Sequence, residues 1–254
     1  MKKSETKIRL DQLLLQRGLV PSRERAQALV IEGKVLVDGQ KIIKSGTSVA
    51  LESEIRLLGE DLKYVSRGGL KLARALDYWK IDVDGKTCLD VGASTGGFTD
   101  CLLQNGAKHV IAVDTGHGQI AMKLRQDPRV RLLEKTNARY LTREQLGETV
   151  DLIVMDVSFI SATMVLPPVL AAAFPSEAAD RVGRALIVLV KPQFEAGREN
   201  VGKGGIVRDP ETQQQAVDRV RDAVTALGVT TIDVIESPIQ GAEGNREFLL
   251  YARY

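Results

Sequence analysis

Four charged residues fall where the apolar segments around them have no structural need of charge. Asp156 ends the run IVMD, Lys191 ends IVLVK, and Glu247 begins EFLLY. Lys71 follows the turn RGG near the start of a helix-like stretch, where its charge opposes the positive end of the helix dipole. Two amines and two carboxylates gathered at one edge of a fold could bind a charged ligand and move a proton.

A simpler explanation exists for each of these four residues taken singly. Each could be a solvated charge at a strand end, or one half of a structural ion pair. Buried strand ends rarely carry unpaired charge, however, so four such residues in one chain favour a functional site. The surrounding elements must then supply a ligand and bring the four side chains together.

The segment LDVGASTGGFTDCLL predicts a strand, a turn and a helix in succession. The turn would let a ligand approach the backbone, because its residues have small side chains or none: Gly92, Ala93, Gly96 and Gly97. A dinucleotide site has the pattern GxGxxG, but Ser94 occupies the middle glycine position here, which disfavours pyrophosphate and therefore NAD.

Three polar residues near this turn suit an adenosyl ligand. Asp114 ends HVIAVD, where a carboxylate can accept hydrogen bonds from ribose hydroxyls. Asp90 could position the turn or approach the amino-acid end of the ligand. Asn137 could meet adenine with its amide or cap the local backbone, and both remain open. DVGASTGGF and the following VD resemble the S-adenosylmethionine sites of Rossmann-like methyltransferases.

An α/β sheet would position these residues. The apolar segments TCLDVGA, HVIAVDTG, DLIVMDVSF and ALIVLVKP alternate with stretches long enough for crossover helices. They predict a parallel sheet covered on both faces, with ligands beyond the carboxyl ends of its strands. The tail TTIDVIESPIQGAEGNREFLLYARY predicts two more strands that close the sheet with an antiparallel edge and return Glu247 to the ligand side.

The first sixty residues predict a small domain of two helices packed on a small sheet. RLDQLLLQR, residues 9–17, predicts a short helix that ends at Gly18. Ser22 is a good N-cap for a second helix, RERAQALVI. KVLVDGQKI predicts two strands that turn at Asp38 and Gly39, and SVALESEIRLL predicts another strand.

Length and charge agree with this division. The chain has 254 residues, of which 44% are hydrophobic, enough for one large and one small domain. Residues 1–80 hold 16 Lys and Arg against 10 Asp and Glu, a net charge of +6, whereas the remainder holds 19 against 23. This asymmetry suggests that a polyanion contacts the front of the chain, although scattered solvated charge explains it equally well.

We expect three segments: 1–63, a small basic domain; 64–84, a linker and first helix; and 85–254, the α/β domain.

Several function classes are disfavoured. Cys88 and Cys101 form no CxxC motif and the only histidines are His109 and His117, so we expect reduced thiols, a cytoplasmic location and no metal. The segment MKKSETKIRLDQ lacks the apolar core of a signal peptide. VLPPVLAAAF is short and broken by prolines, which disfavours a membrane-inserting protein.

The N-terminal pattern resembles the compact RNA-binding module shared by ribosomal protein four of the small subunit, many pseudouridine synthases and tyrosyl-tRNA synthetases. The stretch SRERAQALVIEGKVLVDG, a capped basic helix followed by a glycine and a tight hairpin, carries the resemblance. It implies RNA contact through basic residues here and just beyond: Arg9, Arg23, Arg25, Lys34 and Arg67. The alternative is that these side chains are only solvated.

The larger part resembles the TlyA (haemolysin) family of ribosomal-RNA ribose methyltransferases, within the FtsJ-like group. The matching motifs are RGGLKL, LDVGASTGGFTD, DVSFIS, LVKPQFEAG, VGKGGIVRD and GNREF. The resemblance implies S-adenosylmethionine as cofactor, ribosomal RNA or ribosomal subunits as partners, and a Lys-Asp-Lys-Glu tetrad for 2′-O-methylation formed by Lys71, Asp156, Lys191 and Glu247. Thr95 departs from the wider group, which commonly has proline there.

The chemistry of this reaction fits the tetrad. A ribose 2′-hydroxyl must lose its proton as it attacks the methyl group, and an amine can take that proton if its surroundings favour the neutral form. Burial and the charge of Lys71 would favour a neutral Lys191, while Asp156 and Glu247 would orient the lysines and hold the ribose. The sequence leaves open whether Lys191 is the base or both lysines stabilise a developing alkoxide.

The glycine-rich stretch VGKGGIVRDP carries Lys203 and Arg208 and could fold over RNA phosphate, or be an ordinary mobile loop. Two other functions remain as alternatives. One is a non-catalytic RNA-binding factor associated with ribosomes, and the other is a pore-forming haemolysin. The oligomeric state is not indicated.

Overall fold

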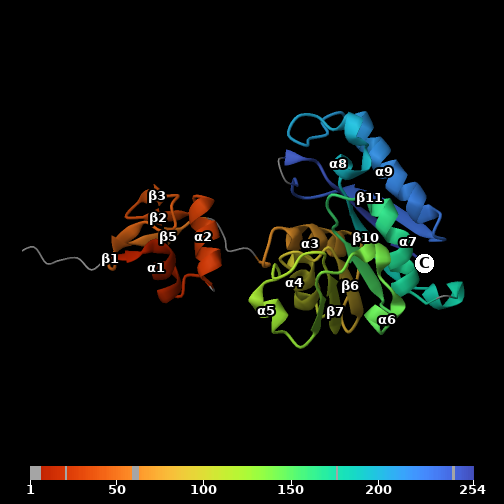
Figure 1. Ribbon diagram of the computed structural model, residues 1–254, viewed down its shortest axis with the longest axis horizontal. Coiled ribbons are helices and arrows are strands. Elements are labelled where there is room, and N and C mark those ends of the chain that lie inside the picture. The colour runs from red at the N-terminus through yellow and green to blue at the C-terminus, as the bar shows by residue number, and fades with distance from the viewer. Residues whose placement is uncertain (1–6, 21, 59–62, 176, 242–243) are drawn as a thin grey trace, which may run out of the picture. The chain divides into compact units, whose positions relative to one another are not determined.

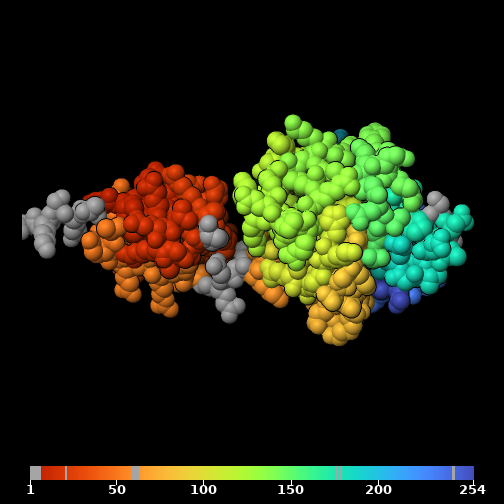
Figure 2. All heavy atoms as spheres, turned by 90° about the horizontal axis from the view of Figure 1, so that it is seen from below, coloured from red at the N-terminus to blue at the C-terminus, as the bar shows by residue number. Residues whose placement is uncertain are grey.

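The computed structural model describes residues 7–20, 22–58, 63–175, 177–241 and 244–254. Contacts between Cα atoms divide the chain into two units, residues 1–61 and 62–254 (Figure 1). In the space-filling view the first unit is red to orange, and the colours of the larger unit run on to blue (Figure 2). Each unit has an apolar core of its own.

The first unit sets helices beside two small sheets. Its described elements are, in chain order, β1 (Lys7–Arg9), α1 (Leu10–Gln16), α2 (Arg23–Ile31), β2 (Val35–Val37), β3 (Gln40–Ile42), β4 (Ser48–Ala50) and β5 (Ile55–Leu57). Oγ of Ser22 accepts the N–H of Arg25 at 3.2 Å, so α2 begins at the predicted cap. Asp38 and Gly39 both have positive φ angles, the tight turn that joins β2 to β3.

The strands of this unit differ from the prediction in three ways. SVALESEIRLL forms two strands, β4 and β5, because the chain turns after Ala50, where Ser53 N–H donates to the Ala50 carbonyl at 3.1 Å. β4 pairs with β1 and β5 pairs with β2, so there are two sheets and not one. β1 was not predicted, since three residues are too few to show an alternating pattern. It includes Arg9, so α1 begins one residue later than predicted.

The larger unit is an α/β sandwich built on a seven-stranded sheet. Its described elements are α3 (Gly68–Tyr78), β6 (Thr87–Val91), α4 (Gly97–Gln104), β7 (His109–Val113), α5 (Met122–Arg125), β8 (Val130–Leu133), η1 (Ala138–Tyr140), α6 (Arg143–Leu146), β9 (Leu152–Met155), α7 (Ala162–Ala173), η2 (Ala178–Arg181), β10 (Ala185–Val190), α8 (Pro192–Glu195), η3 (Arg198–Asn200), α9 (Pro210–Thr225), β11 (Thr231–Glu236) and β12 (Phe248–Arg253).

The strand order is β11-β12-β10-β9-β6-β7-β8. Strands β6 to β10 run parallel, while β12 is antiparallel to both β10 and β11. The predicted Rossmann-like sheet with an antiparallel addition is therefore confirmed. β8 was not predicted, because it is short and Arg131 interrupts its apolar residues. The order reverses between β6 and β9, and the carboxyl ends of these strands border the usual ligand crevice of such sheets.

Helices cover both faces of this sheet (Figure 1). Alternate residues of a strand point to opposite faces, and Ile153 and Val154 of β9 accordingly belong to different apolar clusters. The cluster of Ile153 includes buried residues of α7 and α9, and the cluster of Val154 includes those of α3 and α4. The buried sheet therefore fixes the positions of its strand ends.

Helix α7 corrects one expectation about VLPPVLAAAF. The helix continues through Pro167 and Pro168 and is not broken there. Proline removes a main-chain donor, but α7 buries a stripe that includes Val165, Leu166 and Val169 against the sheet, which offsets the lost bonds. Within the described residues, no helix combines the length and apolar character needed to cross a membrane.

Candidate functional site

Three of the four predicted tetrad residues stand at the ends of neighbouring strands. Asp156 follows β9, Lys191 follows β10, and Glu247 directly precedes β12. Because β12 runs antiparallel to β10, with Phe248 opposite Val190, the start of β12 lies at the same edge as the end of β10. The sheet thus brings together residues from three distant parts of the sequence.

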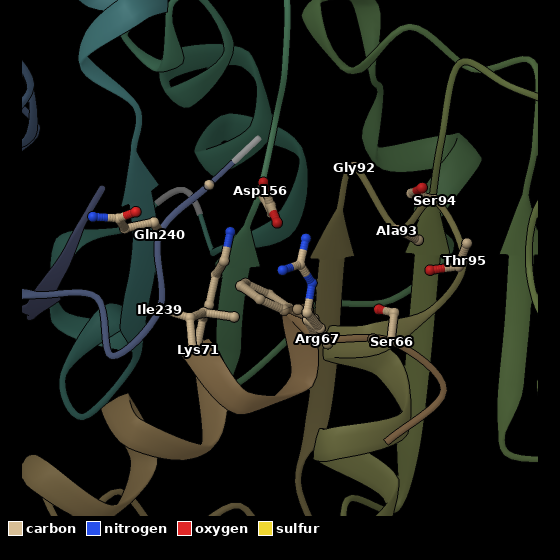
Figure 3. A pocket seen from close by; sticks show the side chains of 14 residues that line it. Ser66, Arg67, Lys71, Gly92, Ala93, Ser94, Thr95, Asp156, Ile239 and Gln240 are labelled. Atoms are coloured by element: carbon tan, nitrogen blue, oxygen red, sulfur yellow. The ribbon is translucent and has the colours of Figure 1, made fainter. Parts of the chain in front are cut away.

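The fourth residue, Lys71, reaches this edge from helix α3. Its Nζ lies 2.5 Å from Oε2 of Glu247, and the two residues are only 8% and 2% exposed. Helix α3 lies close to α4 because Gly97 has no side chain: a Cβ there would overlap Oγ of Ser66 and press on the main-chain nitrogen of Gly69, at 2.9 Å. In Figure 3, the side chains of Lys71 and Arg67 rise from α3 toward Asp156.

Lys191 forms a second pair with Asp156. Its Nζ lies 2.5 Å from Oδ1 of Asp156 and donates a hydrogen bond of 2.7 Å to Oγ of Ser158. Asp156 is less buried than Glu247, and it lines the cavities described below. Ser158 was missed by sequence reasoning, because a serine after a strand is common in loops. Its place in DVSF, two residues after Asp156, was the only available signal.

The glycine turn approaches Asp156 closely. Gly92 has a φ of 87°, and a Cβ there would overlap the carbonyl oxygen of Asp156. Ser94 and Gly96 also have positive φ angles, 48° and 95°, which fold the turn sharply before α4. Ala93 is buried beneath the turn. The absence of a side chain at Gly92 therefore lets β6 and β9 carry the turn and the carboxylate side by side.

Asp114 is held by this turn. Its Oδ2 accepts the N–H of Ser94 at 2.7 Å, and its Oδ1 accepts the N–H of Gly116 at 2.6 Å. A carboxylate has about four lone-pair sites, so each oxygen keeps capacity for one further donor. Asp114 is thus oriented by the backbone and can still receive two hydroxyl groups.

Two adjoining cavities meet at Gly92, Ser94 and Asp156. The first, of about 260 Å³, is lined by the start of α3, including Lys71, and by the glycine turn. The second, of about 390 Å³, is lined by Asp114 and Asn137. Of the predicted tetrad, Lys71 and Asp156 line this two-part cleft. Glu247 and Lys191 line neither cavity and are connected to the cleft through their pairs with Lys71 and Asp156.

Asp90 lies beneath the cleft and lines neither cavity. It is fully buried, and its Oδ2 accepts a hydrogen bond of 2.6 Å from Thr99 Oγ1. Its Oδ1 has no hydrogen-bond partner. Burial raises the pKa of Asp90 to about 7, helped by the charges of Asp156 and Asp114 and opposed by the Thr99 hydrogen bond. Sequence reasoning missed Thr99, whose position on α4 gave no separate signal.

Asn137 combines both of its predicted alternatives in one place. Its Oδ1 accepts the N–H of Arg139 at 3.0 Å and so caps η1, and the residue also lines the second cavity. A cap fixes the direction of the side chain, because Oδ1 must face the helix start.

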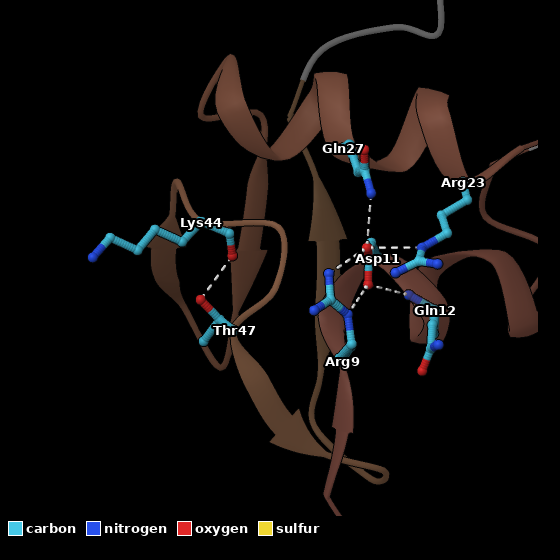
Figure 4. Close-up of polar contacts among 7 residues, drawn as sticks. All are labelled: Arg9, Asp11, Gln12, Arg23, Gln27, Lys44 and Thr47. Atoms are coloured by element: carbon cyan, nitrogen blue, oxygen red, sulfur yellow. Dashed lines mark hydrogen bonds and ion pairs between the residues drawn. The ribbon is translucent and has the colours of Figure 1, made fainter.

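Two of the predicted RNA-binding residues of the first unit, Arg9 and Arg23, contact Asp11 (Figure 4). Buried Asp11 accepts hydrogen bonds from Arg9 (2.9 and 3.0 Å), Arg23 (3.0 Å) and Gln27 (3.0 Å). The Arg9 hydrogen bond is the largest cause that holds the pKa of Asp11 far below its usual range. The side chains of Arg9 and Arg23 remain about half exposed, at 45% and 44%. Arg25 is half-buried on α2, and half-buried Lys34 pairs with Glu32 at 3.0 Å.

The other predicted RNA-binding residues lie in the larger unit. Arg67 is exposed and lines the first cavity. Lys203 and Arg208 are exposed in a loop that Asn245 holds: Oδ1 of Asn245 accepts the N–H of Val207 at 3.1 Å, and Nδ2 donates to the carbonyl of Gly205 at 2.9 Å. Asn245 lies two residues before Glu247, so this loop is tied to the segment that carries a tetrad residue.

Known proteins are similar to this chain over almost its whole length. A model of FtsJ-like methyltransferases matches residues 64–254, and a model of the S4 domain matches residues 8–55. The Mycobacterium tuberculosis protein named 16S/23S rRNA (cytidine-2′-O)-methyltransferase TlyA is 46% identical over 246 residues, which cover 96% of this chain and 89% of the relative. Hemolysin A of Brachyspira hyodysenteriae is 39% identical over 96% of this chain and 99% of the relative.

A solved structure of a Streptococcus thermophilus protein, called a hemolysin, is similar in fold as well. It is 41% identical, has a TM-score of 0.72, and the match covers 98% of this chain and 89% of that one. These findings confirm the resemblance predicted from the motifs. The chain belongs to the FtsJ-like methyltransferase family, in its TlyA branch, and carries an S4 domain at its N-terminus.

Proposed function

We propose that the protein transfers a methyl group from S-adenosylmethionine to a ribose 2′-hydroxyl of ribosomal RNA. The observation that carries the proposal is the meeting of two lysine–carboxylate pairs, Lys71 with Glu247 and Lys191 with Asp156, at the edge of a two-part cleft. The names of the TlyA relatives support the same activity and substrate.

The residues around the cleft fit S-adenosylmethionine. We assign its ribose hydroxyls to Asp114, its adenine to the wall that includes Asn137, and its amino-acid part to the turn from Gly92 to Gly97. We assign Asp90 to support of the turn from beneath, because it is fully buried and lines neither cavity. When bound, the cofactor supplies an electrophilic methyl group.

The lysines and carboxylates of the cleft would act on the RNA. Lys191 is the candidate to receive the proton of the 2′-hydroxyl, because its amine contacts Asp156, which lines both cavities, and Ser158, which lines the second. Lys71, fixed by Glu247, would hold the ribose oxygen as it loses the proton. Holding the hydroxyl in line with a methyl donor contributes much of the rate in such reactions.

The S4 domain would bind the RNA around the target nucleotide. Asp11 holds Arg9 and Arg23 in fixed directions while each guanidinium remains half exposed, which suits contact with phosphates. We assign Arg25, Lys34, Arg67, Lys203 and Arg208 to further RNA contacts, and we propose a cytoplasmic location because ribosomes are assembled there.

Methyl transfer tests the proposal directly. The purified protein and labelled S-adenosylmethionine are incubated with ribosomal subunits and with free ribosomal RNA, and the modified ribose is identified after nuclease digestion. We expect label on a 2′-oxygen. Label on a base would overturn the ribose assignment, and RNA binding without any transfer would identify a non-catalytic factor.

A further inference from the structure

Glu195 is a buried acidic residue four positions after Lys191. It ends α8, is only 3% exposed, and lines neither cavity. Its Oε2 accepts a hydrogen bond of 2.5 Å from Ser161 Oγ, and its Oε1 accepts one of 2.7 Å from the N–H of Ala162. These two donors stand at the N-terminus of α7, where a negative charge is favourable.

The contacts of Glu195 form a second connection between two segments of the site that Lys191 already joins. Residues 156–161 join β9 to α7, and residues 191–195 follow β10. At the cleft, Lys191 connects the segments through Asp156 and Ser158. Behind the cleft, Glu195 connects them again through Ser161 and Ala162.

We propose that Glu195 is a positioning residue for methyl transfer: it holds the segment 156–161 in place while Lys191 engages the ribose. The proposal rests on the function proposed above. An ammonium group has three donors, of which Ser158 receives one, and Asp156 forms an ion pair with the amine, so a substrate oxygen must compete with or join these contacts. The connection at the cleft therefore changes during the reaction, whereas the connection through Glu195 does not touch the substrate.

Backbone strain in the segment makes an anchor necessary. Phe159 has a φ of 64°, a left-handed conformation that costs a bulky residue about 1 to 2 kcal/mol. The residue is 92% exposed, so its burial contributes little to hold the loop, and its ring meets that of Phe194 in the neighbouring segment with centroids 5.4 Å apart. Strained loops persist where their surroundings fix them, and Lys191 and Glu195 provide fixed points on either side of Phe159.

Glu195 could hold the segment through its negative charge or through the hydrogen bonds that its oxygens accept, and a glutamine variant separates the two. Burial raises the pKa of Glu195, while its bonds with Ser161 and Ala162 and the charge of Arg219 lower it. Arg219 of α9 also donates to the main-chain carbonyl of Glu195, so backbone contacts hold this residue independently of its carboxylate. A glutamine side chain could still accept the Ala162 N–H and should preserve most of the anchoring.

The test compares Glu195→Ala and Glu195→Gln with Glu199→Ala, which removes an exposed acid of η3. In the full-length protein with saturating cofactor and RNA, we expect Glu195→Ala to lower the single-turnover rate about tenfold to a hundredfold. Cofactor affinity and half-saturation by RNA should change less than about threefold, and Glu195→Gln should recover most of the rate. A parent-like rate in Glu195→Ala would overturn the proposal, as would equal losses in the alanine and glutamine variants.

A second measurement separates this inference from the proposed function. Hydrogen exchange of residues 156–162, measured without cofactor or RNA, should be faster in Glu195→Ala and unchanged in Glu199→Ala. Unchanged exchange in Glu195→Ala would overturn the anchor even if the parent protein methylates RNA. If exchange rises while the parent transfers no methyl group, the proposed function fails and the anchor remains. Should Glu195→Ala unfold, Ser161→Ala removes one of the two donors and should show the same changes to a smaller extent.

Discussion

Lys71 and Glu247 form an ion pair of 2.5 Å across 176 positions of the sequence, at a site almost closed to water. Removal of one partner from a buried pair leaves an uncompensated charge, which commonly costs about 3 to 5 kcal/mol. An alanine at either position would therefore change stability together with chemistry. The effect on stability can be separated from the effect on catalysis by variants that remove the charge of each partner but keep its shape.

We expect Lys71→Met and Glu247→Gln each to lower the melting temperature, and the double variant to recover most of that loss, because it leaves no buried charge unpaired. All three variants should lower single-turnover methylation about a hundredfold. Thermal unfolding measures the melting temperatures, and rapid-quench assays measure the methylation rates. Parent-like methylation by the double variant would show that the pair is purely structural.

Lys191 should matter more for chemistry than its neighbour Ser158. Lys191→Ala removes the candidate proton acceptor and should cost about a hundredfold or more in the single-turnover rate. Ser158→Ala removes one hydrogen bond to the amine and should cost about threefold to tenfold. Cofactor affinity, measured by calorimetry, should stay close to the parent value in both. A larger loss for Ser158→Ala than for Lys191→Ala would contradict the assignment.

The cofactor assignment predicts that S-adenosylmethionine binds without RNA and that NAD does not. Asp114→Ala should weaken binding of the methyl donor by about 1 to 3 kcal/mol, through loss of one to a few hydrogen bonds. Gly92→Ala should also weaken it, because the new Cβ would push against the Asp156 carbonyl. Calorimetry measures both. Tighter binding of NAD than of S-adenosylmethionine would refute the assignment.

Asp90 should make stability depend on pH. Its folded pKa of about 7 lies above the ordinary value of 3.8, so the folded protein keeps a proton that the unfolded chain has lost. This contribution to stability is fully present below about pH 4 and is lost as the pH rises toward 7. In Asp90→Asn the free energy of unfolding should depend less on pH over this range, by up to about 4 kcal/mol. Asp222→Asn, at an exposed position of α9, is the control. Identical pH dependence in Asp90→Asn and the parent would contradict the predicted effect.

RNA affinity should depend on the first unit. Removal of residues 1–63 should impair RNA binding far more than cofactor binding. A variant with Arg23→Ala and Arg25→Ala should also weaken RNA binding, but less than the truncation does. The slope of log affinity against log salt should fall by about 0.7 to 0.9 per lost phosphate contact. Arg221→Ala, which breaks an exposed pair with Asp218 on α9, is the matched control. Filter binding over a range of salt would reject the assignment if affinity and slope stayed at parent values.

Much of the ligand edge could be predicted from the sequence, because long apolar runs define parallel strands and the residue after each run then falls at a known edge. Asp156, Lys191 and the glycine turn were placed by that reasoning. The same reasoning fails where a charged residue interrupts a short strand, and β1 (KIR) and β8 (VRLL) were missed for this reason. The small domain was correct in its helices and hairpin but wrong in its sheets.

The pairing within the site could not be predicted. Sequence shows that two lysines and two carboxylates reach one edge, but only packing of α3 against α4 and β12 decides that Lys71 meets Glu247. The burial that raises the pKa of Asp90 likewise depends on helices that cover both faces of the sheet. Arg9 and Arg23 were predicted as cations for RNA, whereas their shared partner Asp11 gave no signal in the sequence.

The position of β12 sets the order in which the site can be assembled. β12 lies between β10 and β11, yet it is synthesised after both of them. The antiparallel pair of β11 and β12 can form from neighbouring parts of the chain, but its docking on β10 is a long-range event and correspondingly slow. That docking carries Glu247 to Lys71. A nascent chain would therefore lack its tetrad until the sheet closes, so completion of the fold and acquisition of activity become a single step.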